Sequence, residues 1–194
     1  TQSKTLRRWE LALLLGVALA ALLGVWLDGA QAALSDRVIR LHVLANSDSE
    51  ADQALKLRVR DAVLAEAEEL FVPGAGRAET EELLRAHLYD LAAAGAEVVG
   101  EAGYSYPVTA SLVHDYWFPP KTYTDFALPA GAYTALRIEI GAGGGQNWWC
   151  VVFPPLCLGS VSETTQETAL EAGLTENQVS LMTGEDEGYV VKFK

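Results

Sequence analysis

Three histidines and the aspartates near them are the side chains that could hold a metal ion or act as acid and base. They are His42, His87 and His114, with Asp48, Asp52 and Asp115. No HExxH or similar spacing links them, and His87 falls on a different predicted element from the other two histidines. The acidic residues around Ser49 are sufficiently explained as helix-start residues favoured by the helix dipole. We therefore predict neither a metal site nor a cofactor.

The two cysteines, Cys150 and Cys157, offer two kinds of chemistry. A thiolate nucleophile would need a base, His42 or His114, and an orienting group such as Asn147. Cys150 falls within an apolar strand pattern, however, where burial raises the pKa of a thiol and blocks access. We favour a disulfide between the two cysteines of an exported chain. Two buried thiols are the alternative, because nearby prolines can hold the Cα atoms too far apart. No catalytic residue is predicted.

The loop from Gly141 to Gln146 has the glycine content of a phosphate-binding loop. A Walker A loop needs a Lys followed by Ser or Thr, and a dinucleotide fingerprint opens a helix, whereas this loop leads into Trp148 and Trp149. A hairpin turn is the better interpretation. The missing side chains also allow another backbone to come close.

Aromatic residues and prolines are concentrated between Trp117 and Pro155, and they indicate binding rather than catalysis. About half of them should belong to the core. The others should be exposed, where rigid rings beside a fixed backbone lose little entropy on binding. The residues predicted to bind a partner are Trp117, Phe118, Lys121, Tyr123, Asn147 and Trp148. The same rings could stack on sugars, so glycan binding in the cell wall is a competing interpretation.

Residues 1–32 have the pattern of an export signal. Three basic residues precede an uncharged run from Leu11 to Leu27, and an A-x-A cleavage pattern ends at Ala32. We favour a cleaved signal over an uncleaved membrane anchor, because the run is near the lower limit for spanning a bilayer. Both interpretations place the remaining chain outside the cytoplasm. The first residue is not Met, and a strand pattern stops one residue before the end, which is consistent with a clipped chain.

The chain carries a formal net charge of −12, and the part after residue 32 carries −13 because residues 1–32 hold three basic and two acidic side chains. Such a negative field repels nucleic acid and anionic lipid. We therefore predict no nucleic-acid partner, and contact with a membrane only through the N-terminal segment.

Alternating apolar residues predict a strand from Val38 to Leu44. The residues after it can cap a helix start, with Ser47 and Glu50 spaced as a capping box. These cap residues are Asn46, Ser47, Asp48 and Ser49. The helix that follows, from Glu50 to Phe71, is apolar on two faces. One face should meet a sheet and the other a second helix, Glu79 to Val99, with an external protein as the alternative.

The pattern then changes to strands, expected at Val108–His114, Thr122–Leu128, Tyr133–Ile140 and Trp148–Phe153. Both faces of the last strand are apolar, which predicts a central position in the sheet. Residues 33–158 should form a single two-layer α+β domain: strand, helix, helix, then an antiparallel multi-strand sheet, with both helices on one face. Residues 159–194 form a separate acidic segment with a short helix near Glu163–Ala172 and a final strand near Tyr189–Phe193.

Three strings in the chain resemble the stage II sporulation protein R family and occur in the same order as in that family. They are HVLANSDSEADQALKLRVRD from His42, FPPKTYTDFALPAGAYTALRIEIG from Phe118, and GQNWWCVVFPPLC from Gly145. The resemblance covers Arg37 to Leu158. Thr124 departs from it, because the family's K-T-Y-G string has Gly at that position.

The resemblance implies a non-enzymatic signalling protein that is made in the forespore and exported toward the space between forespore and mother cell. There it would be required for a membrane-embedded peptidase to process the precursor of sigma factor E, and it would act from outside as a ligand of that peptidase. The alternative from another class is an extracytoplasmic peptidoglycan-binding module or cell-wall hydrolase. A hydrolase would require Asp48, Asp52 and a histidine to converge in a cleft.

Overall fold

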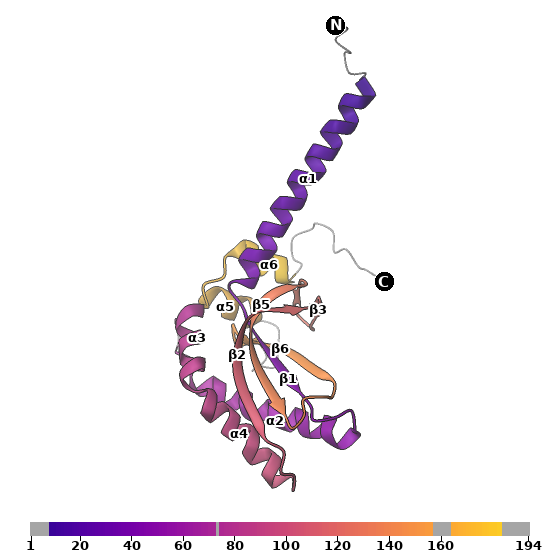
Figure 1. The fold of residues 1–194 in the computed structure, drawn as a ribbon. Coiled ribbons are helices and arrows are strands. Elements are labelled where there is room, and N and C mark those ends of the chain that lie inside the picture. The colour runs from indigo at the N-terminus through magenta and orange to yellow at the C-terminus, as the bar shows by residue number, and fades with distance from the viewer. Residues whose placement is uncertain (1–7, 73, 157–163, 184–194) are drawn as a thin grey trace.

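The computed structural model describes residues 8–72, 74–156 and 164–183. Figure 1 shows a long N-terminal helix that leaves a compact body made of one sheet and several helices. In chain order the elements are α1 (Arg8–Ser35), β1 (Ile39–Leu44), α2 (Glu50–Glu69), α3 (Arg77–Ala86), α4 (Leu88–Glu101), β2 (Val108–Phe118), β3 (Lys121–Thr122), β4 (Ala127–Leu128), β5 (Gly131–Ile140), β6 (Asn147–Phe153), α5 (Thr164–Glu171) and α6 (Glu176–Thr183).

The main sheet has four strands in the order β2-β5-β1-β6. β1 runs parallel to β5, and the other two pairs are antiparallel. The predicted α+β class is confirmed. The predicted central position of β6 is wrong, because β6 lies at one edge of the four-stranded sheet and β1 is inside it. β6 is apolar on both faces because two cores cover it, with Val152 in one and Val151 in the other.

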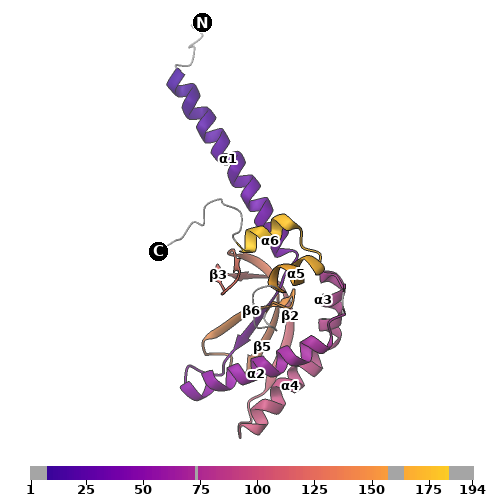
Figure 2. The same cartoon turned by 180° about the vertical axis from the view of Figure 1, so that it is seen from behind.

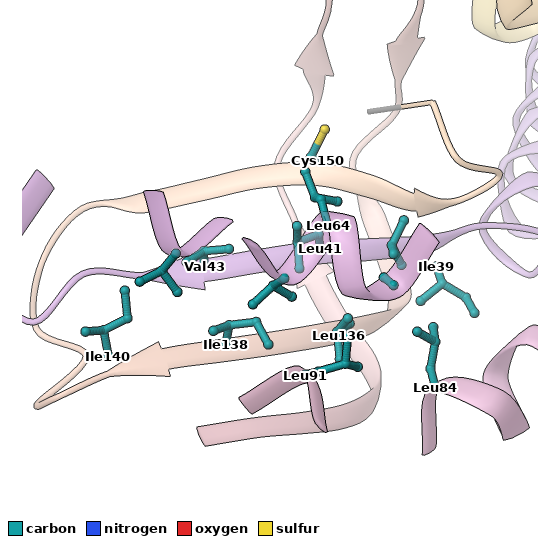
Figure 3. Packing of buried hydrophobic residues seen from close by; sticks show 14 of the residues in the cluster. Ile39, Leu41, Val43, Leu64, Leu84, Leu91, Leu136, Ile138, Ile140 and Cys150 are labelled. Atoms are coloured by element: carbon teal, nitrogen blue, oxygen red, sulfur yellow. The ribbon is translucent and has the colours of Figure 1, made fainter. Parts of the chain in front are cut away.

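The first core lies between the sheet and helices α2, α3 and α4, as predicted for the helical layer. Alternate residues of β1 and β5, among them Leu41 and Leu136, meet α2 and α4 side chains such as Val59 and Leu91 (Figure 3). All four side chains are fully buried. α2 and α4 also pack on each other, which covers the second apolar face of α2. In Figure 2 both helices lie in front of the sheet.

Two elements differ from the sequence-based prediction. The second helix is two helices, α3 and α4, separated by His87, whose backbone N–H bonds the carbonyls of Leu83 and Leu84 while its own φ and ψ leave the helical region. The predicted strand at Thr122–Leu128 is instead a small hairpin of β3 and β4, which pair with each other and not with the main sheet. Stacking of Tyr123 on Phe126, with ring centroids 4.4 Å apart, closes that hairpin.

The second core covers one end of the opposite sheet face. Leu34 at the end of α1 is buried there with Phe118, Tyr133 and Val179 of α6. The Gln178 side chain donates to the carbonyl of Ala33, 3.1 Å away, and so attaches α6 to the last turn of α1. The short helix expected near Glu163–Ala172 is present as α5, whereas the strand pattern at Tyr189–Phe193 lies outside the described residues.

α1 is 28 residues long, and an 18-residue window within it has a mean hydropathy of 2.3, which suits a signal segment or a membrane anchor equally. Its described side chains from Leu11 to Trp26 are exposed, and the A-x-A pattern ending at Ala32 is part of the helix. An N-terminal helix of this kind is compatible with export.

Candidate functional site

Two groups of polar side chains lie at the end of β1 and along β1 with the strands beside it. The first follows β1 directly and is called here the Asn46 clasp, which comprises residues 45–49, Asp52, Lys56 and the loop 141–146. Ser49 is the N-cap of α2, and its side chain accepts from the backbone N–H of Asp52. The Asp52 carboxylate accepts from Ser47 at 2.6 Å and from Asn46 at 2.9 Å, which lowers its pKa. The predicted box between Ser47 and Glu50 is therefore replaced by contacts to Asp52.

The glycine loop fits against the backbone of this helix start. The backbone N–H groups of Gly144 and Gly145 bond the carbonyls of Asn46 and Ala45, and the N–H of Gln146 bonds the Asp48 carboxylate at 2.8 Å. A Cβ atom on Gly145 would lie 2.2 Å from the carbonyl oxygen of Ser47. The loop is not the predicted hairpin turn, because it joins β5 to β6 across the end of β1, which lies between them. Glycine is needed where this crossing brings two backbones together.

The second group is called here the His42 cluster and comprises Arg40, His42, Tyr116, Arg137 and Trp149. The strand register places Ser111, Arg137, His42 and Trp149 in one row across β2, β5, β1 and β6. The row lies on the sheet face opposite α2 and α4, because its sequence neighbours Leu41, Leu136 and Cys150 point into the first core. In Figure 1, α5 and α6 lie beside the end of α1 at the other end of the sheet.

His42 is 1% exposed and is fixed by one strong hydrogen bond. Its Nε2 lies 2.6 Å from Oδ1 of Asn147. Because a carbonyl oxygen only accepts, Nε2 carries the proton, and Nδ1 is an acceptor while the ring is neutral. Burial lowers the pKa of His42, against a smaller opposing effect of the Asn147 bond, so the neutral ring is favoured at neutral pH. The Tyr116 ring covers it at a centroid distance of 5.2 Å.

Arg40 is fully buried without a carboxylate partner among the described residues. Its guanidinium lies 4.2 Å from the centre of the Phe118 ring and 5.0 Å from that of Tyr133. Burial raises the pKa of Tyr133 to about 12, so this tyrosine stays neutral. Its guanidinium donates a hydrogen bond to the Tyr123 hydroxyl at 3.3 Å. A buried cation held only by aromatic faces and one neutral hydroxyl is energetically costly.

Unsatisfied polar atoms gather on this cluster. In the described parts of the chain, seven buried side-chain nitrogen or oxygen atoms have no hydrogen-bond partner. Five of them belong to the cluster: Nε and Nη1 of Arg40, Nδ1 of His42, Nε of Arg137 and Nε1 of Trp149. Each such atom lowers the free energy of unfolding by about 1–3 kcal/mol. Buried polar atoms without hydrogen-bond partners are uncommon in native proteins, and they occur typically at functional sites.

The six residues predicted to bind a partner do not form one surface. The expectation that Phe118 is an exposed anchor is wrong, because its ring is buried between Arg40, Tyr133 and Trp149. Trp117 is 64% exposed, and Lys121 is exposed as well. Tyr123 is half-buried and donates to the carbonyl of Trp149 at 3.3 Å.

Asn147 and Trp148 are neighbours in the chain but belong to different environments. Asn147 is exposed and holds His42. Trp148 packs against the first core, where the Arg60 guanidinium lies 4.4 Å from its ring centre. Sequence reasoning assigned no role to Arg40 and Arg137. Both are cationic residues on strands whose opposite face is mostly apolar, and this pattern was a usable signal.

Of the three groups that a thiol nucleophile would need, the structure brings together the base and the orienting group but not the thiol of Cys150. His42 and Asn147 are paired, whereas Cys150 lies in the first core on the other face and is disulfide-bonded. Cys157 lies outside the described residues, so the predicted pairing stays a prediction. Among the described residues, no group of three or more His, Cys, Asp or Glu is placed to hold a metal ion. Asp48 and Asp52 belong to the Asn46 clasp and do not meet a histidine in a cleft.

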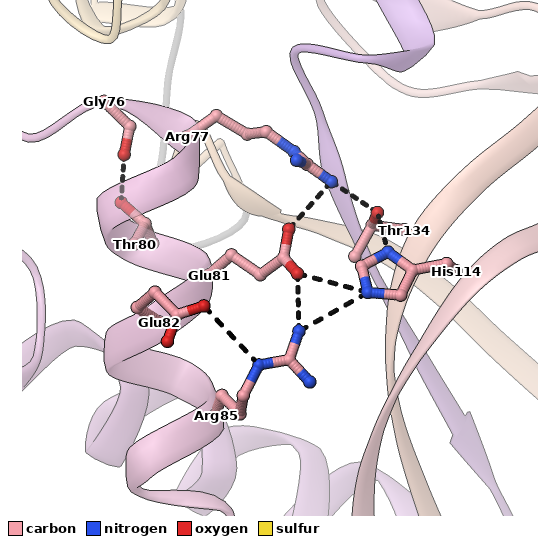
Figure 4. A network of polar contacts seen from close by, with 8 residues as sticks. All are labelled: Gly76, Arg77, Thr80, Glu81, Glu82, Arg85, His114 and Thr134. Atoms are coloured by element: carbon pink, nitrogen blue, oxygen red, sulfur yellow. Dashed lines mark hydrogen bonds and ion pairs between the residues drawn. The ribbon is translucent and has the colours of Figure 1, made fainter.

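His114 belongs to a third polar network, which attaches α3 to β2 (Figure 4). The Glu81 side chain lies 2.9 Å from Arg77, 2.7 Å from Arg85 and 3.2 Å from His114. His114 precedes a bulge at which Asp115 has φ +54°, and the bulge shifts the pairing of β2 with β5. The carboxylate of Glu81 is fully engaged here, so this network has a sufficient structural role.

Comparison with known proteins agrees with the resemblance in the sequence. The family model described as Stage II sporulation protein R matches residues 35–163. The chain belongs to the stage II sporulation protein R family. Stage II sporulation protein R of Bacillus subtilis (strain 168) is 39% identical over 124 residues, which are 64% of this chain and 55% of that relative. The chain therefore matches little more than half of the relative's length. No solved structure matches. Membership in the family supports a role in sporulation.

Proposed function

We propose that this protein is an exported sporulation signal that activates a membrane-embedded peptidase, which processes the precursor of sigma factor E. The observation that carries the proposal is the family match over residues 35–163, which includes all strands of the sheet. In this proposal the chain has no enzymatic activity of its own. Its activity consists of binding the extracytoplasmic part of the peptidase from the space between forespore and mother cell.

The arrangement of polar groups supports a ligand rather than an enzyme. A catalyst needs a nucleophile or metal beside its acid and base, and the described residues place neither beside His42. A protein ligand presents groups that its partner can complete, and the His42 cluster holds five buried polar atoms without a partner among the described residues. The apolar α1 helix is compatible with the export that the proposal requires.

Reconstitution in a bacterium that does not sporulate tests the proposal. The full chain is co-expressed with the candidate peptidase and a tagged sigma-E precursor, and the cleaved fraction of the precursor is measured on immunoblots. We expect cleavage only when all three proteins are present. A variant with Leu14→Arg and Leu19→Arg should give none, because each charge costs roughly 3 kcal/mol within an apolar segment. Cleavage with this variant while no exported protein is detectable would contradict the proposal.

A wall-binding module is the second candidate, favoured by the 64% exposure of Trp117, since exposed aromatic rings stack on sugars. Cosedimentation of the protein with purified peptidoglycan distinguishes the two functions. The signalling proposal predicts no more bound protein for the wild type than for Trp117→Ala. A clear loss of binding in that variant would favour the wall-binding function.

A further inference from the structure

We propose that the His42 cluster is a receptor site for a carboxylate side chain of a protein partner. The inference rests on the proposed function, because it takes the ligand of this chain to be a protein. The components of the cluster come from four strands: Arg40 and His42 from β1, Tyr116 from β2, Arg137 from β5 and Trp149 from β6.

The chemistry of the missing ligand follows from the unsatisfied atoms. The four unpartnered nitrogens of Arg40, Arg137 and Trp149 can only donate hydrogen bonds. The fifth unpartnered atom, Nδ1 of His42, is an acceptor while the ring is neutral, so donors outnumber acceptors four to one. Such a set favours an oxygen-rich ligand, and two guanidinium groups make a negative one favourable. Glu139 lies 2.7 Å from Nη2 of Arg137. Within residues 8–72, 74–156 and 164–183, Arg137 Nε and the Arg40 guanidinium have no carboxylate partner. A carboxylate supplies two acceptor oxygens in a small volume.

The cluster is accessible from its rim. The Arg137 side chain is 23% exposed and that of Glu139 is 38% exposed. Asn147 is exposed, and Tyr116 and Trp149 are half-buried. The Tyr116 ring spans the cluster, 5.2 Å from the His42 ring and 5.3 Å from the Arg137 guanidinium. Because its ring contacts both His42 and Arg137, we take Tyr116 as the cover of the site.

Nuclear magnetic resonance of the full chain in detergent micelles tests the assignment directly. N-acetyl-glutamic acid amide is titrated into the 15N-labelled protein, with N-acetyl-glutamine amide at equal ionic strength as the neutral control. We expect saturable shifts of the indole N–H of Trp149 and the Nε–H of Arg137 with the acid only. Trp149→Phe and Arg137→Lys assign the two signals. The indole N–H of Trp148 is the internal control, because it is also buried without a partner but lies against the first core.

Three outcomes of this titration would contradict the carboxylate site. Equal shifts with the glutamine compound, or no shift at Trp149 and Arg137, would overturn the carboxylate site. Shifts with inorganic phosphate but not with the glutamic acid compound would overturn the choice of carboxylate. Shifts in which Trp148 moves as much as Trp149 would show a general effect of the additive, and would also overturn the site.

The reconstituted cleavage assay connects the site to activation. Arg137→Gln should lower precursor cleavage by at least about tenfold at equal amounts of exported protein, because an interfacial charge pair loses one partner. Arg58→Gln is the matched control: its side chain is 53% exposed and pairs with Glu101 at 3.7 Å, and we expect wild-type cleavage. If the wild type itself fails to activate the peptidase while the glutamic acid titration succeeds, the proposed function fails and the carboxylate site stands. If the wild type and Arg137→Gln activate equally, the site is not the contact with the peptidase and the inference fails.

Discussion

The Asn46 clasp and the His42 cluster use buried polar side chains in opposite ways. In the clasp, donors and acceptors meet: Asp52 accepts from Ser47 and Asn46, and Lys56 donates to Gln53 and to the carbonyl of Gln146. None of the seven unsatisfied buried atoms in the described residues belongs to the clasp, whereas five belong to the cluster. Both regions lie within residues 35–163, which the family model matches. We therefore assign different roles to the two regions: the Asn46 clasp fixes a crossing of two backbones, and the His42 cluster binds a partner.

The largest effect should come from crowding the clasp. Gly145→Ala places a Cβ 2.2 Å from the carbonyl oxygen of Ser47, so two backbones must separate. We expect a loss of about 3 kcal/mol or more in the free energy of unfolding, measured by urea denaturation. Gly100→Ala in α4 is the control, because no atom lies within 4 Å of the added methyl group. It should be neutral or stabilising by up to about 1 kcal/mol. Equal stability of the two variants would contradict the close approach of the glycine loop to the backbone of Ser47.

Replacing one buried cation in each region tests whether buried polar groups stabilise the Asn46 clasp but not the His42 cluster. Lys56→Met should destabilise by about 1–3 kcal/mol, because it leaves the oxygens of Gln53 and Gln146 without their donor. Arg40→Met should be neutral or stabilising by about 1 kcal/mol, since it removes two unsatisfied donors from an aromatic pocket. Arg40→Met should nevertheless fail to activate the peptidase. Urea denaturation and precursor cleavage, measured on the same preparations, check both parts. A destabilised but active Arg40→Met would reverse the roles assigned here.

The pH dependence of stability should reveal the carboxylate of the clasp. Hydrogen bonds from Ser47 and Asn46 lower the pKa of Asp52 in the folded protein. The ionised carboxylate therefore adds stability above the unfolded pKa of about 3.9. That stability is lost as the pH falls through the lower folded value. Thermal unfolding followed from pH 6 downward should show a steeper loss in the wild type than in Asp52→Asn. Parallel curves would show that Asp52 is not held by these bonds.

The smallest effect concerns the protonation of His42. Burial lowers its pKa, so the neutral ring adds stability above the unfolded value of about 6.5, and this contribution is lost as the pH falls toward the lower folded value. A bound carboxylate beside the ring should raise that pKa, because it favours the charged form. Titration of the Cε1 proton signal with and without N-acetyl-glutamic acid amide measures the change. A pKa that falls or stays constant on adding this ligand would contradict a carboxylate next to His42.

Local sequence patterns predicted most elements, because they depend on residues close together in the chain. The alternation in Val38–Leu44, the polar residues before α2 and the strand periods after Tyr106 each produced an element near the expected place. Strand order could not be predicted in this way. β6 is apolar on both faces as a central strand would be, and only the crossing of the glycine loop over β1 puts it at the edge. The break at His87 was missed because a helix pattern continues on both sides of it.

The candidate site was predicted only in fragments. His42 and Asn147 were each singled out for a nucleophilic chemistry, Asn147 also for partner binding, but Cys150 lies on the other face of the sheet. Phe118 was expected to be exposed. Its burial follows from Arg40, whose guanidinium needs an aromatic face once it lies inside the protein. Such a pairing joins residues far apart in the chain, across strands whose order was unknown. The unsatisfied atoms that define the cluster can be recognised only when the surroundings of each side chain are known.

Photocrosslinking in cells that carry the reconstituted pathway tests most directly whether the His42 cluster contacts the peptidase. A photoreactive phenylalanine analogue replaces Tyr116 in one variant and Tyr89, which is 83% exposed on α4, in the other. Both variants are compared at equal amounts of exported protein, and crosslinked products are identified with an antibody against the tagged peptidase. We expect a crosslink to the peptidase from position 116 and none from position 89. A peptidase crosslink from position 89 and none from position 116 would place the binding surface on the helical layer and contradict the account.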